Sequence, residues 1–133
     1  MTADQPLAFI YDRRATSHRE LLEARLKACA KYTSAQGWGF GGWWVDEGEE
    51  ALTDRRPAFD LLLHAMQDAG SDRPRVCLIF GWGRLSHNER IRGVMMRRVL
   101  LSGGWVETCQ GEKRTADGQW IPTGRLTSAP MLP

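Results

Sequence analysis

The chain has 133 residues and a mass of 15.0 kDa, and its 42% hydrophobic and 26% charged residues are ordinary for one soluble globular domain. No apolar run approaches the ~18 residues that a membrane-spanning helix needs. The first six residues have neither the basic start nor the apolar stretch of a signal peptide. We therefore expect a cytoplasmic protein that does not enter a membrane.

The formal net charge is only +2, but the charges are unevenly distributed. Residues 46–50 form an acidic cluster, whereas residues 73–106 contain seven arginines and a single acid, Glu89. All but three of the 18 basic residues are arginine, whose planar guanidinium makes paired hydrogen bonds to phosphate or carboxylate. The arginine-rich stretch is compatible with a nucleic-acid contact and, equally, with a solvated helix face.

The cysteines and histidines do not show the pattern of a metal site. Cys29, Cys77 and Cys109 are odd in number and far apart, and none has a Cys or His partner at the spacing that zinc sites use. The three histidines are equally scattered. We expect three reduced thiols, no metal and no cofactor.

The first half of the chain predicts two strands around one helix. Residues 7–11 (LAFIY) are a short apolar run bounded by Pro6, which is typical of a buried strand. Residues 17–20 (SHRE) have the form of a capping box, and apolar residues follow at helical spacing, which predicts a helix over 18–35. Residues 43–45 (WWV) predict a second strand, and we interpret its aromatic residues as packing groups.

The second half continues the alternation of helices and strands. Residues 53–57 (TDRRP) open a second helix, with proline near its first position, that ends near Gly70. Residues 76–80 are a continuous apolar strand, residues 88–102 predict a third helix, and residues 105–109 predict a fourth strand.

Strands and helices in this order predict an α/β fold with three layers, in which a parallel-rich central sheet is flanked by helices. We place this domain at residues 1–111. Residues 112–133 lack periodicity and are rich in Gly, Pro, Ser and Thr, which predicts a flexible C-terminal tail. Ligands of such sheets bind beyond the carboxyl ends of the strands, where we expect residues 12–17, 46–56 and 81–87.

Arginines from these three segments are candidates for an anion site. Arg13 follows the first strand, Arg55 precedes the second helix with Arg56 beside it, and Arg84 follows the third strand. Guanidinium groups that converge on one sheet edge hold a phosphate and offset the charge that develops in phosphoryl transfer. Arginines at strand ends are also common surface residues, and the spacing alone leaves both interpretations open.

The residues around these arginines resemble the catalytic domain of the serine recombinases, the resolvase and invertase family. Tyr11 and Arg13 match the family's Y-x-R-x-S opening. Four further segments agree in order and spacing: GW at 37–38, VDEG at 45–48, TDR at 53–55, and the strand and loop of 76–85, which resemble those around the family's DRLSR motif. The resemblance covers residues 7–111 and implies a resolvase-like fold.

In that family a serine attacks the DNA phosphodiester and forms a phosphoserine link, while arginines hold the phosphate and no metal is required. The resemblance implies that phosphate or DNA is bound by a set of basic residues: Arg13, Arg14, Arg55, Arg56, Arg84 and His87. It also implies that the DNA backbone is the partner, held weakly and with a strong dependence on salt.

Three departures from the family pattern fall in the same site. The nucleophile position is Ala15, whose methyl group can neither attack nor lose a proton. The acidic position of the DRLSR loop is Gly83, and its final arginine is His87. Together these changes predict that the domain is catalytically defective.

Two neighbouring hydroxyl groups, on Thr16 and Ser17, are alternative nucleophiles. Reaction requires the attacking oxygen at about 3–3.5 Å and in line, which a shift of one or two residues along a loop disrupts. Ser17 is also the predicted helix cap, where its hydroxyl faces backbone N–H groups. We therefore favour the interpretation that Ala15 has removed the nucleophile and that neither Thr16 nor Ser17 replaces it.

In the family, a long helix and a DNA-binding region follow the catalytic domain. Here only residues 116–126 resemble the start of that helix, so we expect no independent recognition of a DNA sequence. The sequence contains neither a G-x-G-x-x-G motif after its first strand nor a P-loop, which argues against a nucleotide-binding α/β protein.

Three functions remain. The first is a pseudoenzyme that binds DNA phosphate, or that associates with itself or with a full-length recombinase. The second is an active recombinase or other phosphodiester-transfer enzyme that uses Thr16, Ser17 or a partner's serine. The third is a vestigial interaction domain from a mobile element.

Overall fold

The computed structural model describes residues 5–14, 19–48, 53, 55–115 and 120–121. Within them, a six-stranded sheet has the order β2-β1-β3-β4-β5-β6. Its strands are β1 (Leu7–Arg14), β2 (Gly39–Glu47), β3 (Arg75–Ile79), β4 (Trp105–Thr108), β5 (Lys113–Arg114) and β6 (Trp120–Ile121). The helices are α1 (Arg19–Gln36), α2 (Pro57–Asp68) and α3 (Glu89–Leu101), with a short 3₁₀ turn, η2 (Trp82–Arg84), after β3.

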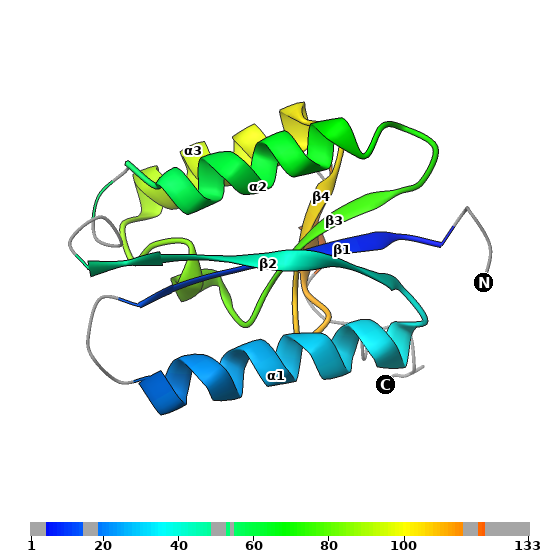
Figure 1. Cartoon of the computed structure of the whole chain (residues 1–133). Coiled ribbons are helices and arrows are strands. Elements are labelled where there is room, and N and C mark those ends of the chain that lie inside the picture. Colours follow the sequence, from blue (N-terminus) through cyan, green and yellow to red (C-terminus); the bar gives the residue numbers. More distant parts are fainter. Residues whose placement is uncertain (1–4, 15–18, 49–52, 54, 116–119, 122–133) are drawn as a thin grey trace.

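The first four strands are parallel, and helices connect them across both faces of the sheet. β1 pairs with β2 on one side and with β3 on the other, and β3 pairs with β4, all in parallel register. Figure 1 shows α1 on one face and α2 with α3 on the opposite face. The predicted three-layer α/β fold, with its parallel-rich sheet, is confirmed.

The helix-covered sheet has a hydrophobic core on each face. The larger core lies under α2 and α3 and is built around Phe9, Phe59 and Met66. The smaller core lies under α1 and contains Ile10, Cys29 and Leu78. Because helices cover both faces, the central strands are buried on both sides, and all five residues of β3 are buried.

The sheet continues beyond residue 111, where the sequence predicted the start of a flexible tail. Residues 113–114 pair antiparallel with Val106 and Glu107 of β4, and residues 120–121 pair antiparallel with residues 113–114. Strands of two residues are too short to show a period of two, which is why the sequence pattern did not predict them. Residues 122–133 of the predicted tail lie outside the described residues.

Local sequence explains where the described helices begin. Asn88 precedes α3, and its Oδ1 accepts a hydrogen bond from the Ile91 backbone N–H at 3.0 Å. Pro57 opens α2, as predicted, but Arg56 at the capping position makes no side-chain cap. The predicted cap of α1, Ser17, lies outside the described residues. No helix within the described ranges is long and apolar enough to cross a membrane.

Candidate anion-binding site

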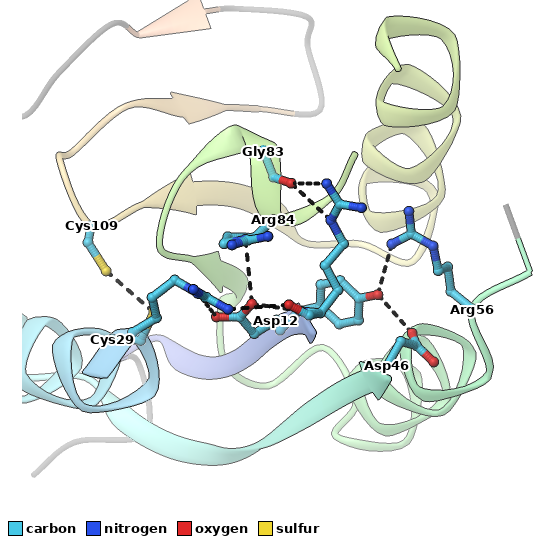
Figure 2. A network of polar contacts seen from close by, with 10 residues as sticks. Asp12, Cys29, Asp46, Arg56, Gly83, Arg84 and Cys109 are labelled. Atoms are coloured by element: carbon cyan, nitrogen blue, oxygen red, sulfur yellow. Dashed lines mark hydrogen bonds and ion pairs between the residues drawn. The ribbon is translucent and has the colours of Figure 1, made fainter. Parts of the chain in front are cut away.

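Charged side chains gather at the carboxyl ends of β1 and β2 and at the turn that follows β3. β1 ends with Asp12, Arg13 and Arg14, and β2 carries Asp46 near its end. Because these strands are parallel, their carboxyl ends meet at one edge of the sheet. The turn η2 brings Arg84 to the same edge (Figure 2).

Asp12 joins three elements at this edge. Its side chain is only 1% exposed, and its Oδ2 accepts a hydrogen bond from Arg25 Nε of α1 at 2.8 Å. Its Oδ1 accepts a hydrogen bond from the Arg13 backbone N–H at 2.6 Å and lies 3.5 Å from Arg84 Nε. A carboxylate this deeply buried needs opposite charges, and Asp12 has two guanidinium groups beside it.

Arg13 is held by a backbone carbonyl of the η2 turn. Its Nε and Nη2 both donate to the Gly83 carbonyl oxygen, at 3.0 and 2.8 Å. This bond crosses from the end of β1 to the turn after β3, and the Arg13 residue is 5% exposed. Because the Gly83 carbonyl is uncharged, these hydrogen bonds hold the Arg13 guanidinium at the sheet edge without neutralising its charge.

A second buried network links β1, β2 and the start of α2. The Tyr11 hydroxyl donates to Asp46 Oδ2 at 2.7 Å and accepts a hydrogen bond from Arg56 Nη1 at 3.0 Å. Asp46 also accepts hydrogen bonds from the Ala58 and Phe59 backbone N–H groups at 2.8 and 3.1 Å. Asp46 therefore caps α2 from the neighbouring strand, in place of the missing local cap.

Arg56 retains one donor that this network does not use. The residue is 1% exposed, and its Nε donates to the Thr53 carbonyl at 2.5 Å. Its Nη2 is buried and has no hydrogen-bond partner among the described residues. This Nη2 is a buried donor whose hydrogen-bonding capacity the network leaves unused.

We call Arg13, Arg25, Arg56 and Arg84 the arginine cluster. Burial lowers the pKa of Arg13, and the positive charges of Arg84 and then Arg56 lower it further. Burial also lowers the pKa of Arg84, with Asp12 opposing that shift and Arg25 adding to it. Among the described residues, the four guanidinium groups lie near two carboxylates, Asp12 and Asp46, an excess of positive charge that an anion would relieve.

The predicted binding residues fall into two groups. Arg13, Arg56 and Arg84 belong to the arginine cluster. Arg55, next to Arg56, has an exposed side chain, and Arg14 forms an ion pair with Glu47 at the ends of β1 and β2.

His87 lies beside Gly83, which the sequence predicts to stand at the position of the family's acidic residue. A Cβ atom at position 83 would lie 2.9 Å from His87 Cε1 and 3.3 Å from its Nδ1. A carboxylate side chain at position 83 therefore requires the exposed His87 ring to move. Ala15, Thr16 and Ser17 lie outside the described residues.

The arginine-rich stretch of residues 73–106 does not form one patch. Arg75 donates to the Met66 and Gly103 carbonyl oxygens, and Arg92 donates to the Ser86 carbonyl. Arg98 forms an ion pair with Asp60. Of the arginines in this stretch, Arg84 is the one that joins the arginine cluster.

Sequence reasoning missed four residues of the site: Asp12, Tyr11 as a hydrogen-bonding group, Arg25 and Asp46. Arg25 lies within a helix, where a basic residue usually faces solvent. One signal was available for Asp12, because an acid directly after the buried residues of a strand calls for a buried partner. Among the described residues, no group of three His, Cys, Asp or Glu side chains could hold a metal ion.

Solved structures with the same arrangement of strands and helices identify the fold. The N-terminal catalytic domain of TP901-1 integrase matches with a TM-score of 0.64 and 20% identity, over 77% of this chain and 76% of that one. The C-terminal catalytic domain of ISC1926 TnpA, an IS607-like serine recombinase, matches with a TM-score of 0.64 and 22% identity, over 77% and 68%. The chain has the fold of serine recombinase catalytic domains. A resolvase family site-specific recombinase from Streptococcus pneumoniae extends the match to 92% of this chain and 80% of its own, with a TM-score of 0.64 and 15% identity.

The serine recombinase fold confirms the resemblance on which the sequence interpretation rested. No protein-family model matches the chain, and no curated protein matches it either. At identities of 15–22%, the likeness is one of fold. Function must be argued from the site itself.

Proposed function

We propose that this chain is a recombinase-like domain that binds DNA phosphate through its arginine cluster and does not cleave DNA. The observation that carries the proposal is the convergence of Arg13, Arg56 and Arg84 on one sheet edge, with an unpaired Nη2 on Arg56. A phosphate at this sheet edge offsets the excess positive charge, and Arg84, whose side chain is 22% exposed, is within its reach.

The absence of cleavage follows from Ala15, at the position of the family's nucleophile. A methyl group has no lone pair and no acidic proton, so it forms no phosphoester. Gly83 and His87 replace a carboxylate and an arginine in the same region. Binding groups are present in this site, and the attacking group is missing.

Binding is tested by fluorescence anisotropy with labelled duplex DNA of unrelated sequences across a salt series. We expect weak binding that is similar for all sequences and that falls steeply as salt rises. Arg84→Gln removes one phosphate contact, so the slope of log K against log salt becomes shallower by about 0.9.

The matched control is Lys31→Gln, which removes the same charge from an exposed position in the last part of α1. Because α1 starts near the carboxyl edge of the sheet and returns toward the amino edge, Lys31 lies away from the arginine cluster. A slope that changes equally in both variants, or no binding at low salt, contradicts the proposal.

The lack of cleavage is tested with a nicked suicide substrate that traps covalent protein–DNA adducts. We expect no adduct from the natural sequence. An adduct contradicts the proposal, and its loss in Thr16→Ala or Ser17→Ala would identify the replacement nucleophile.

A further inference from the structure

Two cysteines far apart in the sequence meet beneath α1. Cys29 lies in α1, Cys109 directly follows β4, and their Sγ atoms share a hydrogen bond at 3.4 Å (Figure 2). Cys29 is part of the smaller core, and Cys109, which is partly buried, packs against it. The third cysteine, Cys77, belongs to the larger core on the opposite face of the sheet.

We propose that Cys29 and Cys109 form a reversible disulfide that ties α1 to the end of β4 when the protein meets a peroxide. This inference is independent of the proposed function, because neither thiol belongs to the arginine cluster. It assigns a redox role to two residues that the sequence alone marked only as reduced thiols.

The geometry requires a small movement of side chains. A disulfide bond is about 2.05 Å long, so the two sulfur atoms must approach by about 1.4 Å from their present contact. The Cys109 backbone N–H donates to the Ile79 carbonyl at 3.1 Å, which holds the backbone of Cys109 against the sheet. Side-chain rotation at Cys29 and Cys109 supplies the remaining approach.

The surroundings assign different roles to the two thiols. Cys109 is half-buried and accessible to a small oxidant, whereas Cys29 is 1% exposed. The hydrogen bond with Cys29 lowers the pKa of Cys109, against the opposing effects of burial, Glu107 and Asp12. The same hydrogen bond and burial raise the pKa of Cys29 far above its usual value. Because Cys109 is the more exposed of the two, it is the thiol that a peroxide reaches first, and it reacts as its thiolate.

The oxidation balances in two steps. The Cys109 thiolate attacks one oxygen of hydrogen peroxide, the O–O bond breaks, and the products are Cys109 sulfenic acid and hydroxide, which takes up a proton to become water. The Cys29 sulfur then attacks the Cys109 sulfur, the S–S bond forms, the S–O bond breaks, and the second water leaves with the Cys29 proton. Two thiols and one peroxide give one disulfide and two waters, and an added dithiol reverses the reaction.

The crosslink would restrain α1, the helix that contacts Asp12 of β1. Arg25 lies one turn before Cys29 on α1, and Arg25 Nε donates to Asp12. A bond that fixes α1 to the end of β4 therefore also fixes the helix that carries Arg25. It also closes a long loop of chain, which restricts the unfolded state, so we expect the oxidised protein to resist urea better than the reduced protein.

The experiment treats the full chain with a small excess of hydrogen peroxide and then blocks the remaining thiols with an alkylating reagent. We expect two of the three thiols to be lost and a peptide map to recover Cys29 joined to Cys109 within one chain. The dithiol should restore all three thiols. No variant is needed for this result.

Two variants sharpen the result. Cys77→Ala should still form the crosslink, whereas Cys109→Ser should retain both of its remaining thiols at the same peroxide dose. Three results overturn the proposal: thiols that stay free in the natural sequence, Cys109 that is oxidised to sulfinic acid without a crosslink, or a disulfide that uses Cys77 or a second chain.

Discussion

Asp12 is the residue on which the sheet edge depends most directly. Its buried carboxylate contacts Arg25 from α1 and Arg84 from the η2 turn. The loss of one partner from such a group leaves charges buried without compensation, which costs more than the pair itself contributes. The same residue therefore organises the arginine cluster and makes the fold sensitive to substitution there.

We predict that Asp12→Asn lowers the free energy of unfolding by about 3 kcal/mol, measured by urea denaturation. The amide keeps the shape of the side chain but removes the charge that faces Arg25 and Arg84. The control is Glu23→Gln, which breaks an exposed pair with Arg19 and should cost less than about 0.5 kcal/mol. Equal losses in the two variants contradict the assignment of a buried charge network.

A serine restored at position 15 should recover little chemistry. We predict that Ala15→Ser forms no detectable adduct with a nicked suicide substrate, because the resemblance to the family implies that Gly83 and His87 stand where a carboxylate and an arginine are needed. The comparison variant is Ala15→Ser with Gly83→Asp and His87→Arg. A full adduct yield from Ala15→Ser alone would show that the remaining site is competent, which contradicts this prediction.

Among the elements, α2 shows most clearly a feature that could not be predicted from the local sequence, namely its N-terminal cap. The proline at its start was predicted, and the helix begins at Pro57. Its cap comes from Asp46 on β2, and no local pattern indicates a capping residue from another strand. The sequence placed Asp46 in an acidic cluster and in a segment at the sheet edge, but gave it no capping role.

The other predictions likewise succeeded where the signal is local in the sequence and failed where the feature depends on tertiary contacts. Helices such as Glu89–Leu101 lie within one residue of their predicted bounds, because hydrophobic periodicity and turn residues are local signals. β1 runs to Arg14, three residues past its predicted end at residue 11, so Arg13 lies within the strand and not after it. The choice between Arg55 and Arg56 depends on which side chain turns inward at the start of α2, and adjacent arginines look alike in sequence. Burial of Arg56 against Tyr11 is a tertiary effect that motif spacing does not encode.

The turn between α3 and β4 provides an element-scale prediction. A Cβ atom at Gly104 would lie 2.5 Å from the Arg75 carbonyl oxygen and 2.4 Å from Met66 Cε. Because the carbonyl belongs to the paired strand β3, it cannot move without breaking the sheet. We predict that Gly104→Ala lowers the free energy of unfolding by at least about 2 kcal/mol, measured by urea denaturation.

Gly93 is the matched control for that substitution. It lies exposed within α3, and a Cβ atom there would contact nothing within 4 Å. Gly93→Ala should raise the free energy of unfolding by about 0.5–1 kcal/mol, because alanine favours the helix. If both variants shift stability in the same direction, the close approach at Gly104 does not limit the fold.

At the scale of the whole molecule, apolar packing and the buried charges occupy different parts of the sheet. Both faces of the sheet supply apolar packing, while the arginine cluster lies at the carboxyl edge. Stability from the core offsets the repulsion among Arg13, Arg56 and Arg84, and the carboxylates reduce it only in part. A site of this kind is expected to be stabilised by any anion that occupies it.

This expectation can be measured without DNA. We predict that sulfate stabilises the chain against thermal unfolding more than chloride at equal ionic strength, since an anion that binds only the native state adds RT ln(1 + [L]/Kd). At about ten times the dissociation constant, that gain is about 1.4 kcal/mol. Two acceptor oxygens of one sulfate can pair with separate guanidinium groups, which chloride cannot do.

Arg84→Gln separates binding at the cluster from the general effect of sulfate on proteins, which strengthens hydrophobic burial in any fold. The general effect should survive in the variant, whereas the part due to the cluster should fall. Lys31→Gln should keep the full difference between sulfate and chloride, because its charge lies toward the other end of α1. If the difference is the same in all three proteins, sulfate acts through the solvent, and the arginine cluster is not an anion site.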